Sequence, residues 1–159
     1  TIGDFERMSD HAVNIKDVAK ELHEKKLAFS PEAQKEVSVL SGAIREILEI
    51  TEQAFINNDL FMAAKVEPLE QVVDKLISKI KDHHIARLQR GECTIEMGFI
   101  LNDLLNNYSR ISDHCSNIAV AVIEVEHNSF DTHKYLNDVK YGSVDFAESF
   151  EEFSKKYAL

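Results

Sequence analysis

The stretch D-F-E-R-M-S-D-H-A-V-N-I at residues 4–15 recurs as N-Y-S-R-I-S-D-H-C-S-N-I at residues 107–118. Both copies place apolar residues at intervals of three and four, which is the period of one face of an α-helix. The polar residues that return in register are Arg7/Arg110, Ser9/Ser112, Asp10/Asp113, His11/His114 and Asn14/Asn117, followed by the apolar pair Ile15/Ile118. The repeat therefore predicts two helices of the same design within one chain.

The helical period continues outward from both copies. It predicts helices over about 1–26, 31–57, 60–88 and 94–125, and two shorter helical stretches in the aromatic-rich tail, broken around Gly142. Ser30-Pro31-Glu32 is typical of a helix start, and Gly91 of a helix end. Because the connections are short, we expect an all-α, antiparallel up-and-down helix bundle, with a short helical C-terminal tail packed along its outside.

The composition indicates a single globular domain. The chain has 159 residues, of which 44% are hydrophobic and 29% are charged, and its formal net charge is −10. This charge disfavours nucleic acid and anionic membranes as partners, and favours metal cations or basic protein surfaces. Cys93 and Cys115 lack the spacing of a disulfide scaffold, which indicates a reducing cytoplasm. With no apolar run of about 20 residues, we expect no direct membrane insertion, and the helical spacing at the first residues suggests a segment of a longer protein.

Acidic residues recur at helical spacing in three places. In the first copy of the repeat, Glu6 and Asp10 lie one turn apart, and in the second copy Asp113 lies on the same face as Asn117. A third pair, Glu70 and Asp74, falls on the helix expected next to the second copy. Carboxylates one turn apart lie about 5–6 Å from each other, close enough to bind one hard cation together. A solvated stripe, or ion pairs with nearby lysines and arginines, would explain the same spacing.

F-E-R-M-S-D-H-A-V-N-I and Y-S-R-I-S-D-H-C-S-N-I resemble the twin E-R-I-G-D-H-A-x-N-I signatures of the PhoU family. The resemblance implies the end of one three-helix bundle over 1–28, a second bundle over 30–128, and an aromatic helical tail over 129–159. It also implies that metal ions, with iron, zinc and magnesium as candidates, bind to Glu6, Asp10, Glu70, Asp74 and Asp113. Ser109 departs from the pattern, because it replaces the usual Glu and removes one carboxylate.

The tail is similar to a second kind of protein. F-D-T-H-K-Y-L-N-D-V-K at 130–140 and F-E-E-F-S-K-K-Y-A-L at 150–159 resemble the cytoplasmic end of sodium/phosphate cotransporters that carry a PhoU-like domain. Together the resemblances imply a cytoplasmic, non-enzymatic domain that regulates phosphate uptake and phosphate homeostasis. They imply tethering to the inner face of the membrane, and partners that are the transporter portion of the same protein, a separate transporter or sensor protein, or a second copy in a homodimer.

Two rival functions follow from the same residues. A helical protein-interaction bundle without metal would use the acidic stripes for ion pairs and the aromatic tail for docking. A ferritin-like di-iron protein needs two Glu-x-x-His motifs, and the chain has one such spacing, at Glu124 and His127. We expect His83 and His84 to be surface residues and both cysteines to serve helix packing. His11 and His114 either orient the neighbouring aspartates or make polar contacts in the core.

Overall fold

Every element that the computed structural model describes is an α-helix, and the description covers residues 1–127 and 144–159. The helices are α1 (Ile2–Lys25), α2 (Pro31–Asn57), α3 (Leu60–Gln89), α4 (Ile95–His127) and α6 (Val144–Lys156). The first four lie within two residues of the predicted ranges. The predicted Phe130, Tyr135, Tyr141 and Gly142 of the tail lie outside the described residues.

The helix ends follow local side-chain signals. Ser30 caps α2, since its side chain accepts a hydrogen bond from the backbone N–H of Ala33 at 3.2 Å, and Pro31 occupies the first turn. Asp59 caps α3 in the same way through the N–H groups of Phe61 and Met62. Gly91 has a φ of 70°, a conformation that favours glycine, in the turn between α3 and α4. These signals explain why the boundaries could be predicted.

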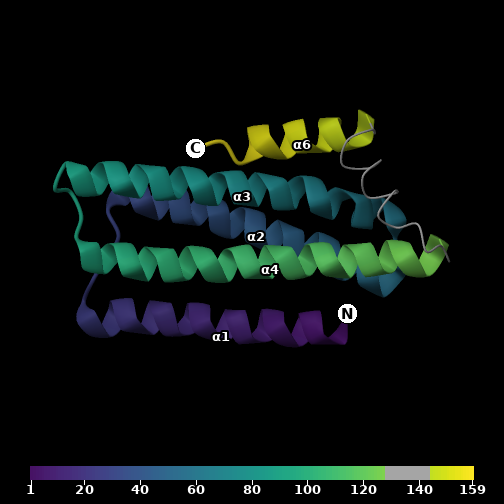
Figure 1. Ribbon diagram of the computed structural model, residues 1–159, viewed down its shortest axis with the longest axis horizontal. Coiled ribbons are helices and arrows are strands. Elements are labelled where there is room, and N and C mark those ends of the chain that lie inside the picture. The colour runs from purple at the N-terminus through teal and green to yellow at the C-terminus, as the bar shows by residue number, and fades with distance from the viewer. Residues whose placement is uncertain (128–143) are drawn as a thin grey trace.

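The core lies between α2, α3 and α4, which run side by side (Figure 1). Its largest fully buried side chains come from all three helices and include Leu40 and Ile47 of α2, Leu69 and Ile80 of α3, and Leu101, Leu105 and Ile118 of α4. The predicted apolar stripes of α3 and α4 are thus confirmed. On α2 the helical spacing also predicts Leu48 and Phe55 in the apolar stripe, and this was wrong, because the two residues are 36% and 46% exposed.

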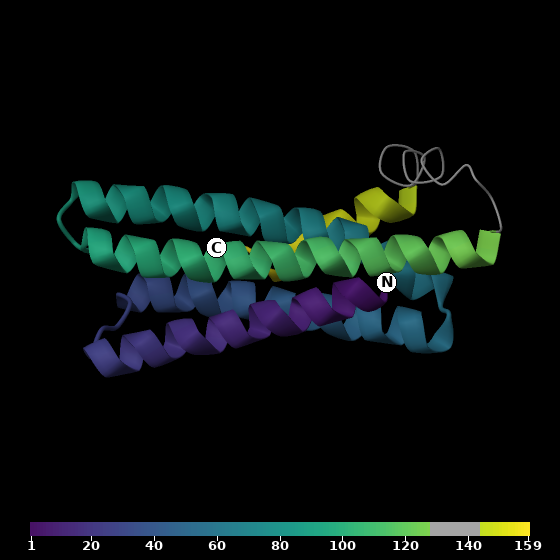
Figure 2. The ribbon, with the colours of Figure 1, turned by 60° about the horizontal axis from the view of Figure 1, so that its bottom comes forward.

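The first helix packs on the outside of this core, along α4 (Figures 1 and 2). A second apolar cluster joins Val18 of α1 to Met97, Ile100 and Leu104 of α4. Val18 is the one buried residue of α1, whereas Ile2 at its start is 87% exposed. The predicted inward stripe of α1 is therefore only half covered, because α1 has one main neighbouring helix.

The last helix lies along the opposite side of the bundle, on α3 (Figure 1). Phe153 is 6% exposed and belongs to the main core. Tyr157 donates a short hydrogen bond to the Glu46 carboxylate of α2, and the Nζ of Lys79 donates to the backbone oxygen of Leu159 at 2.6 Å. For its described part, the prediction of a helical tail packed along the outside of the bundle is confirmed.

Candidate functional site

The two copies of the repeat meet each other across the antiparallel pair α1 and α4. The imidazole rings of His11 and His114 are stacked with their centroids 5.8 Å apart and their planes 29° apart. Met8 and Cys115 meet beside them, with their sulfur atoms 3.7 Å apart. The repeated segments therefore build one interface, and each copy packs on the other.

The hydrogen bonds of this interface are reciprocal. His11 Nδ1 lies 2.9 Å and Asn14 Nδ2 3.1 Å from Oδ1 of Asn107. In the other direction, His114 Nδ1 lies 3.0 Å and Asn117 Nδ2 3.3 Å from Oδ1 of Asp4. Asp4 and Asn107 are the first residues of the two copies. Each copy thus places its His and its Asn on the first residue of the other copy, which gives the interface an approximate two-fold symmetry.

This arrangement, which we term the clasp, consists of Asp4, His11, Asn14, Asn107, His114 and Asn117. Asn107 is 9% exposed, so its polar atoms need partners inside the protein. Burial raises the pKa of the Asp4 carboxyl, but the hydrogen bonds from His114 and Asn117 oppose this effect, and the net pKa is below the usual value. Of the two alternatives for His11 and His114, the structure shows polar contacts, and the partners are Asn107 and Asp4, not the aspartates that precede the two histidines.

The predicted metal-binding carboxylates are placed differently in the two copies. Glu6 and Asp10 are exposed on α1. Asp113 on α4 has a side chain that is 39% exposed and pairs with Arg110 at 3.4 Å. Glu70 is half-buried and Asp74 is exposed on α3. Asp74 on α3 and Asp113 on α4 lie close enough for the charge of Asp113 to raise the pKa of Asp74.

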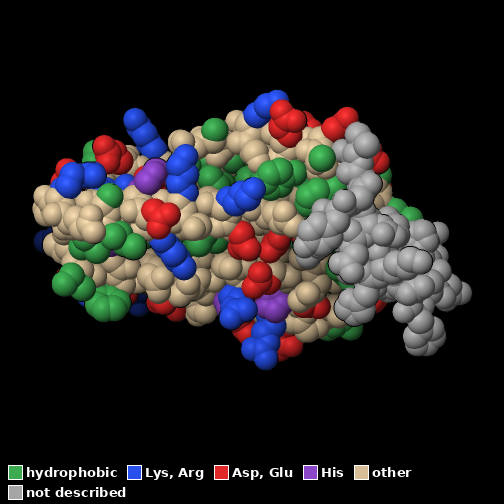
Figure 3. All heavy atoms as spheres, turned by 45° about the horizontal axis from the view of Figure 1, so that its top comes forward, with side chains coloured by type: hydrophobic (Ala, Val, Ile, Leu, Met, Phe, Trp, Pro, Cys, Tyr) green, Lys and Arg blue, Asp and Glu red, His purple; other side chains and the backbone are tan. Residues whose placement is uncertain are grey.

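Neighbouring carboxylates affect the pKa of Asp74. Partial burial, the charge of Asp113 and the charge of Glu67 together raise the pKa of the Asp74 carboxyl above its usual value, against a smaller opposing effect of Lys81. Figure 3 shows acidic side chains grouped near the middle of one face, beside a histidine and several basic side chains. The charges of Asp74 on α3 and Asp113 on α4 thus influence each other across the two helices.

Sequence reasoning missed Glu67 as a member of this group. Its side chain is 8% exposed and accepts a hydrogen bond from the Ser116 hydroxyl of α4 at 2.7 Å. Glu67 precedes Glu70 by three residues and Asp74 by seven, so helical spacing could have found it. Within residues 1–127 and 144–159, no three His, Cys, Asp or Glu side chains form a group that could hold a metal ion. The metal ligands therefore stay a prediction.

His83 and His84 were expected at the surface. The His83 side chain is 41% exposed but has a polar partner, whereas His84 is half-buried. His83 Nδ1 lies 2.6 Å from the Glu36 carboxylate, which also accepts two hydrogen bonds from Arg87, at 3.0 and 2.8 Å. Burial raises the pKa of Glu36, but these bonds from Arg87 and His83 outweigh it and lower the pKa overall. Because Glu36 and Arg87 are nearly fully buried, they form an internal ion pair between α2 and α3.

His84 points to the other side of α3, where it lies between two hollows. Its Nδ1 is 3.7 Å from the sulfur of Cys93, a partner that the sequence did not reveal. One hollow, with a volume of about 310 Å³, is lined by the 27–30 connection, Arg87, Cys93 and Met97. Burial, together with the charge of Arg87, lowers the pKa of His84 below its usual value despite the opposing charge of Glu36. Cys115 is buried, as predicted, and burial raises the pKa of its thiol to about 11.

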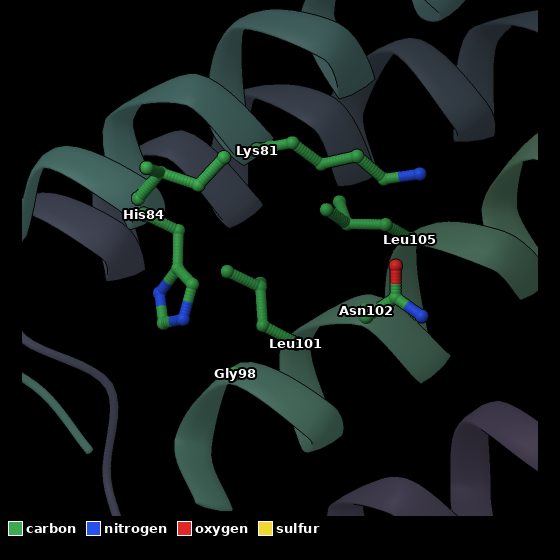
Figure 4. Close-up of a pocket in the computed structure, with 7 residues that line it drawn as sticks. Lys81, His84, Gly98, Leu101, Asn102 and Leu105 are labelled. Atoms are coloured by element: carbon green, nitrogen blue, oxygen red, sulfur yellow. The ribbon is translucent and has the colours of Figure 1, made fainter. Parts of the chain in front are cut away.

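The second hollow is a pocket of about 220 Å³ between α3 and α4 (Figure 4). Lys81, His84 and Ile85 line it from α3, and Gly98, Leu101, Asn102 and Leu105 line it from α4. Most of its lining is apolar.

The described helices include none that is long and apolar enough to cross a membrane. Glu124 is exposed at the end of α4, and the His127 side chain lies outside what the structure describes.

Comparison with known proteins identifies a family that this chain matches. The profile of the PhoU domain matches residues 37–122, more than half of the chain, which includes most of α2, all of α3 and most of α4 with the second copy of the repeat. The phosphate-specific transport system accessory protein PhoU homolog 1 of Thermotoga maritima is 26% identical over 140 residues. The alignment covers 88% of this chain and 59% of that relative, so the chain spans about three fifths of its length. No solved structure gives a significant match.

Proposed function

The chain belongs to the PhoU domain family, and from this membership we propose that it regulates phosphate uptake and phosphate homeostasis as a non-enzymatic domain. The observation that carries the proposal is the family match over the α2–α4 core, together with a relative that is named as an accessory protein of a phosphate-specific transport system. The clasp supports the proposal, because the two family-like motifs of the sequence pack on each other and form one interface between α1 and α4.

The finer proposal concerns the setting of the domain. We propose that it is the cytoplasmic part of a sodium/phosphate cotransporter, held at the inner face of the membrane by the transporter portion of the same protein. The support is the resemblance of the tail, of which α6 is seated on α3 through the buried Phe153. A regulator that is fused to its target acts at high effective concentration, so weak contacts suffice.

Phosphate uptake by cells tests this proposal directly. The intact gene is compared with one from which the codons for residues 1–159 are removed, at low and high external phosphate. We expect uptake to depend less on the supply of phosphate without the domain. A variant that changes only an exposed residue, Lys20→Ala, serves as the control and should behave as the wild type. The same uptake with and without the domain would remove the regulatory proposal.

We also propose that Asp74 and Asp113, with Glu70 beside Asp74 on α3, bind a metal cation, with iron, zinc and magnesium as candidates. Carboxylate oxygens are suitable donors for these ions. The pKa of Asp74 is raised first by partial burial and then by the charges of Asp113 and Glu67, and a cation would relieve that repulsion. Glu6 and Asp10 stay candidate ligands on α1. A metal-free interaction bundle is the alternative, in which Arg110 compensates Asp113.

Metal content separates the two possibilities. Protein purified without chelator should contain metal, and Asp113→Ala and Glu70→Ala should each reduce it, because each removes a donor. Asp17→Ala, which changes an exposed carboxylate of α1 paired with Lys16, is the control. Equal metal content in all four proteins would favour the interaction bundle.

A further inference from the structure

The pocket between α3 and α4 contains polar groups that have no partner within the described part of the chain. His84 Nε2 is buried without a hydrogen-bond partner. Lys81 and Asn102, on opposite walls, make no hydrogen bond or ion pair with any described residue, and Figure 4 shows both beside Leu105. A few unpaired polar groups around an apolar pocket are typical of a site for a ligand or a partner side chain.

Gly98 determines the shape of this pocket. A Cβ atom at this position would lie 2.7 Å from Nε2 of His84, which is closer than such contacts allow. Glycine inside a helix is less favourable than alanine. The absence of a side chain at Gly98 therefore lets the imidazole of His84 lie against α4 and leaves the pocket open.

The rim of the pocket is apolar and faces outward. Ile85 is 52% exposed, and on α4 the neighbouring Ile95 and Phe99 are 71% and 73% exposed. Ile95, Phe99 and Asn102 follow the spacing i, i+4, i+7, so they share one face of α4. Figure 3 shows hydrophobic side chains exposed at the end of the molecule that carries the turn between α3 and α4. Large exposed apolar side chains around a pocket indicate a protein contact.

The charge of the site specifies the partner. None of the residues that line the pocket is acidic, and Lys81 supplies a positive charge at its edge. Asp74 lies two turns away on α3, and the charge of Lys81 lowers its pKa slightly. The two side chains form no ion pair with each other in the described part of the chain. Because the chain as a whole has a net charge of −10, it repels acidic partners except where a local cation compensates. Within the lining of the pocket, Lys81 is the cation with which an acidic side chain of a partner can pair.

We propose that this groove, formed by the pocket and the rim residues Ile85, Ile95 and Phe99, binds an acidic amphipathic helix of a protein partner. One apolar side chain of the helix enters the pocket, and an Asp or Glu one turn away pairs with Lys81. A groove between two antiparallel helices suits a helical ligand. A small carboxylic acid would fill the pocket but would leave Ile95 and Phe99 exposed. The inference rests on the proposed regulatory function, since it names the surface through which the domain would contact its target.

Binding of a designed probe tests the groove. The probe is a synthetic amphipathic helix with leucines along one face and a glutamate one turn from the central leucine, and a second probe has lysine in place of that glutamate. We expect the glutamate probe to bind the wild-type chain and to shift the NMR signals of residues around the pocket. Lys81→Glu should weaken this binding about tenfold, the equivalent of about 1.4 kcal/mol, and should make the lysine probe the tighter ligand.

Matched variants separate the groove from other apolar surfaces. Phe99→Ser should weaken binding at least about fivefold, as expected for an aromatic contact, whereas Phe61→Ser, which changes a phenylalanine that is 67% exposed at the other end of the bundle, should not. Equal binding of the two probes, no binding at millimolar concentration, or equal effects of the two phenylalanine variants would overturn the inference.

The uptake assay distinguishes a failure of this inference from a failure of the proposed function. If removal of the domain changes uptake while Lys81→Glu and Phe99→Ser do not, the regulatory function stands and the groove is wrong. If the probes bind with the expected charge preference while removal of the domain leaves uptake unchanged, the groove stands and the regulatory function is wrong.

Discussion

Asp74 is a residue whose charge the fold makes unfavourable. Its pKa is raised by partial burial, then by the charges of Asp113 and Glu67. The folded chain therefore binds a proton at Asp74 more tightly than the unfolded chain does, and stability falls as the pH rises from the usual value of 3.8 through the folded pKa. Above that window the penalty is fully present. Repulsion that reduces stability at neutral pH is the kind of cost that a functional site retains.

Removal of this charge should stabilise the protein. We expect Asp74→Asn to raise the free energy of unfolding at pH 7 by up to about 1 kcal/mol, a small value because the side chain is exposed. The gain should vanish below pH 3.8, where both states are protonated. Urea unfolding at a series of pH values checks this, with Asp17→Asn on α1 as the control. A less stable Asp74→Asn at pH 7 would contradict the electrostatic explanation.

At the scale of elements, α2 and α3 are joined by an internal ion pair. The Glu36 and Arg87 side chains make two hydrogen bonds, and Arg87 is 3% exposed. The lowered pKa of Glu36 contributes stability above its usual value of 4.5, and this contribution is lost as the pH falls through the folded pKa. The pair fixes how the start of α2 lies against the end of α3, where the two hollows form.

Loss of one partner should cost far more than loss of both. Arg87→Met leaves the buried Glu36 carboxylate with His83 as its remaining partner, and we expect a loss of about 3 kcal/mol. The double variant Glu36→Leu with Arg87→Met removes both charges and should recover most of that loss. Chemical unfolding at pH 7 measures the two. A double variant as unstable as Arg87→Met alone would show that packing, and not charge, governs this contact.

At the scale of the whole molecule, α1 packs on the outside of a core that is formed mainly by α2, α3 and α4. It has one buried residue, Val18, and depends on the clasp for its polar contacts with α4. Elements with few buried contacts open at a lower free energy than the core. From the approximate two-fold symmetry of the clasp we further expect its two halves to contribute similar free energies to the attachment of α1.

Hydrogen exchange should detect both properties. His11→Ala and His114→Ala each remove one ring of the stack and one hydrogen bond, so we expect losses of similar size, about 1–2 kcal/mol. Exchange in both variants should accelerate in α1 more than in α2 and α3. His23→Ala, which changes an exposed histidine of the same helix, is the control. Uniform acceleration over all helices would mean that α1 is part of the cooperative core.

Much of the site was beyond prediction because its contacts join distant residues. Asp10 and Asp113 were predicted as site residues because they recur in the repeat. The contacts between the two copies, however, are made by His11, Asn14 and their counterparts, which bind residues more than 90 positions away. Glu67 was missed although its spacing was visible. The contacts of His83 and His84 could not be predicted because Glu36 and the Gly98 face of α4 lie on other helices.

The sequence by itself determined the helices, their order and the apolar stripes of α3 and α4, because capping, turn formation and amphipathic periodicity act within a few neighbouring residues. It also determined the family, because the repeated motif is a local pattern. Only the tertiary structure decided that the two copies face each other, which carboxylates come close, and where a pocket stays open. Those features depend on side chains meeting across helices, and their geometry is set by the packing of the whole bundle.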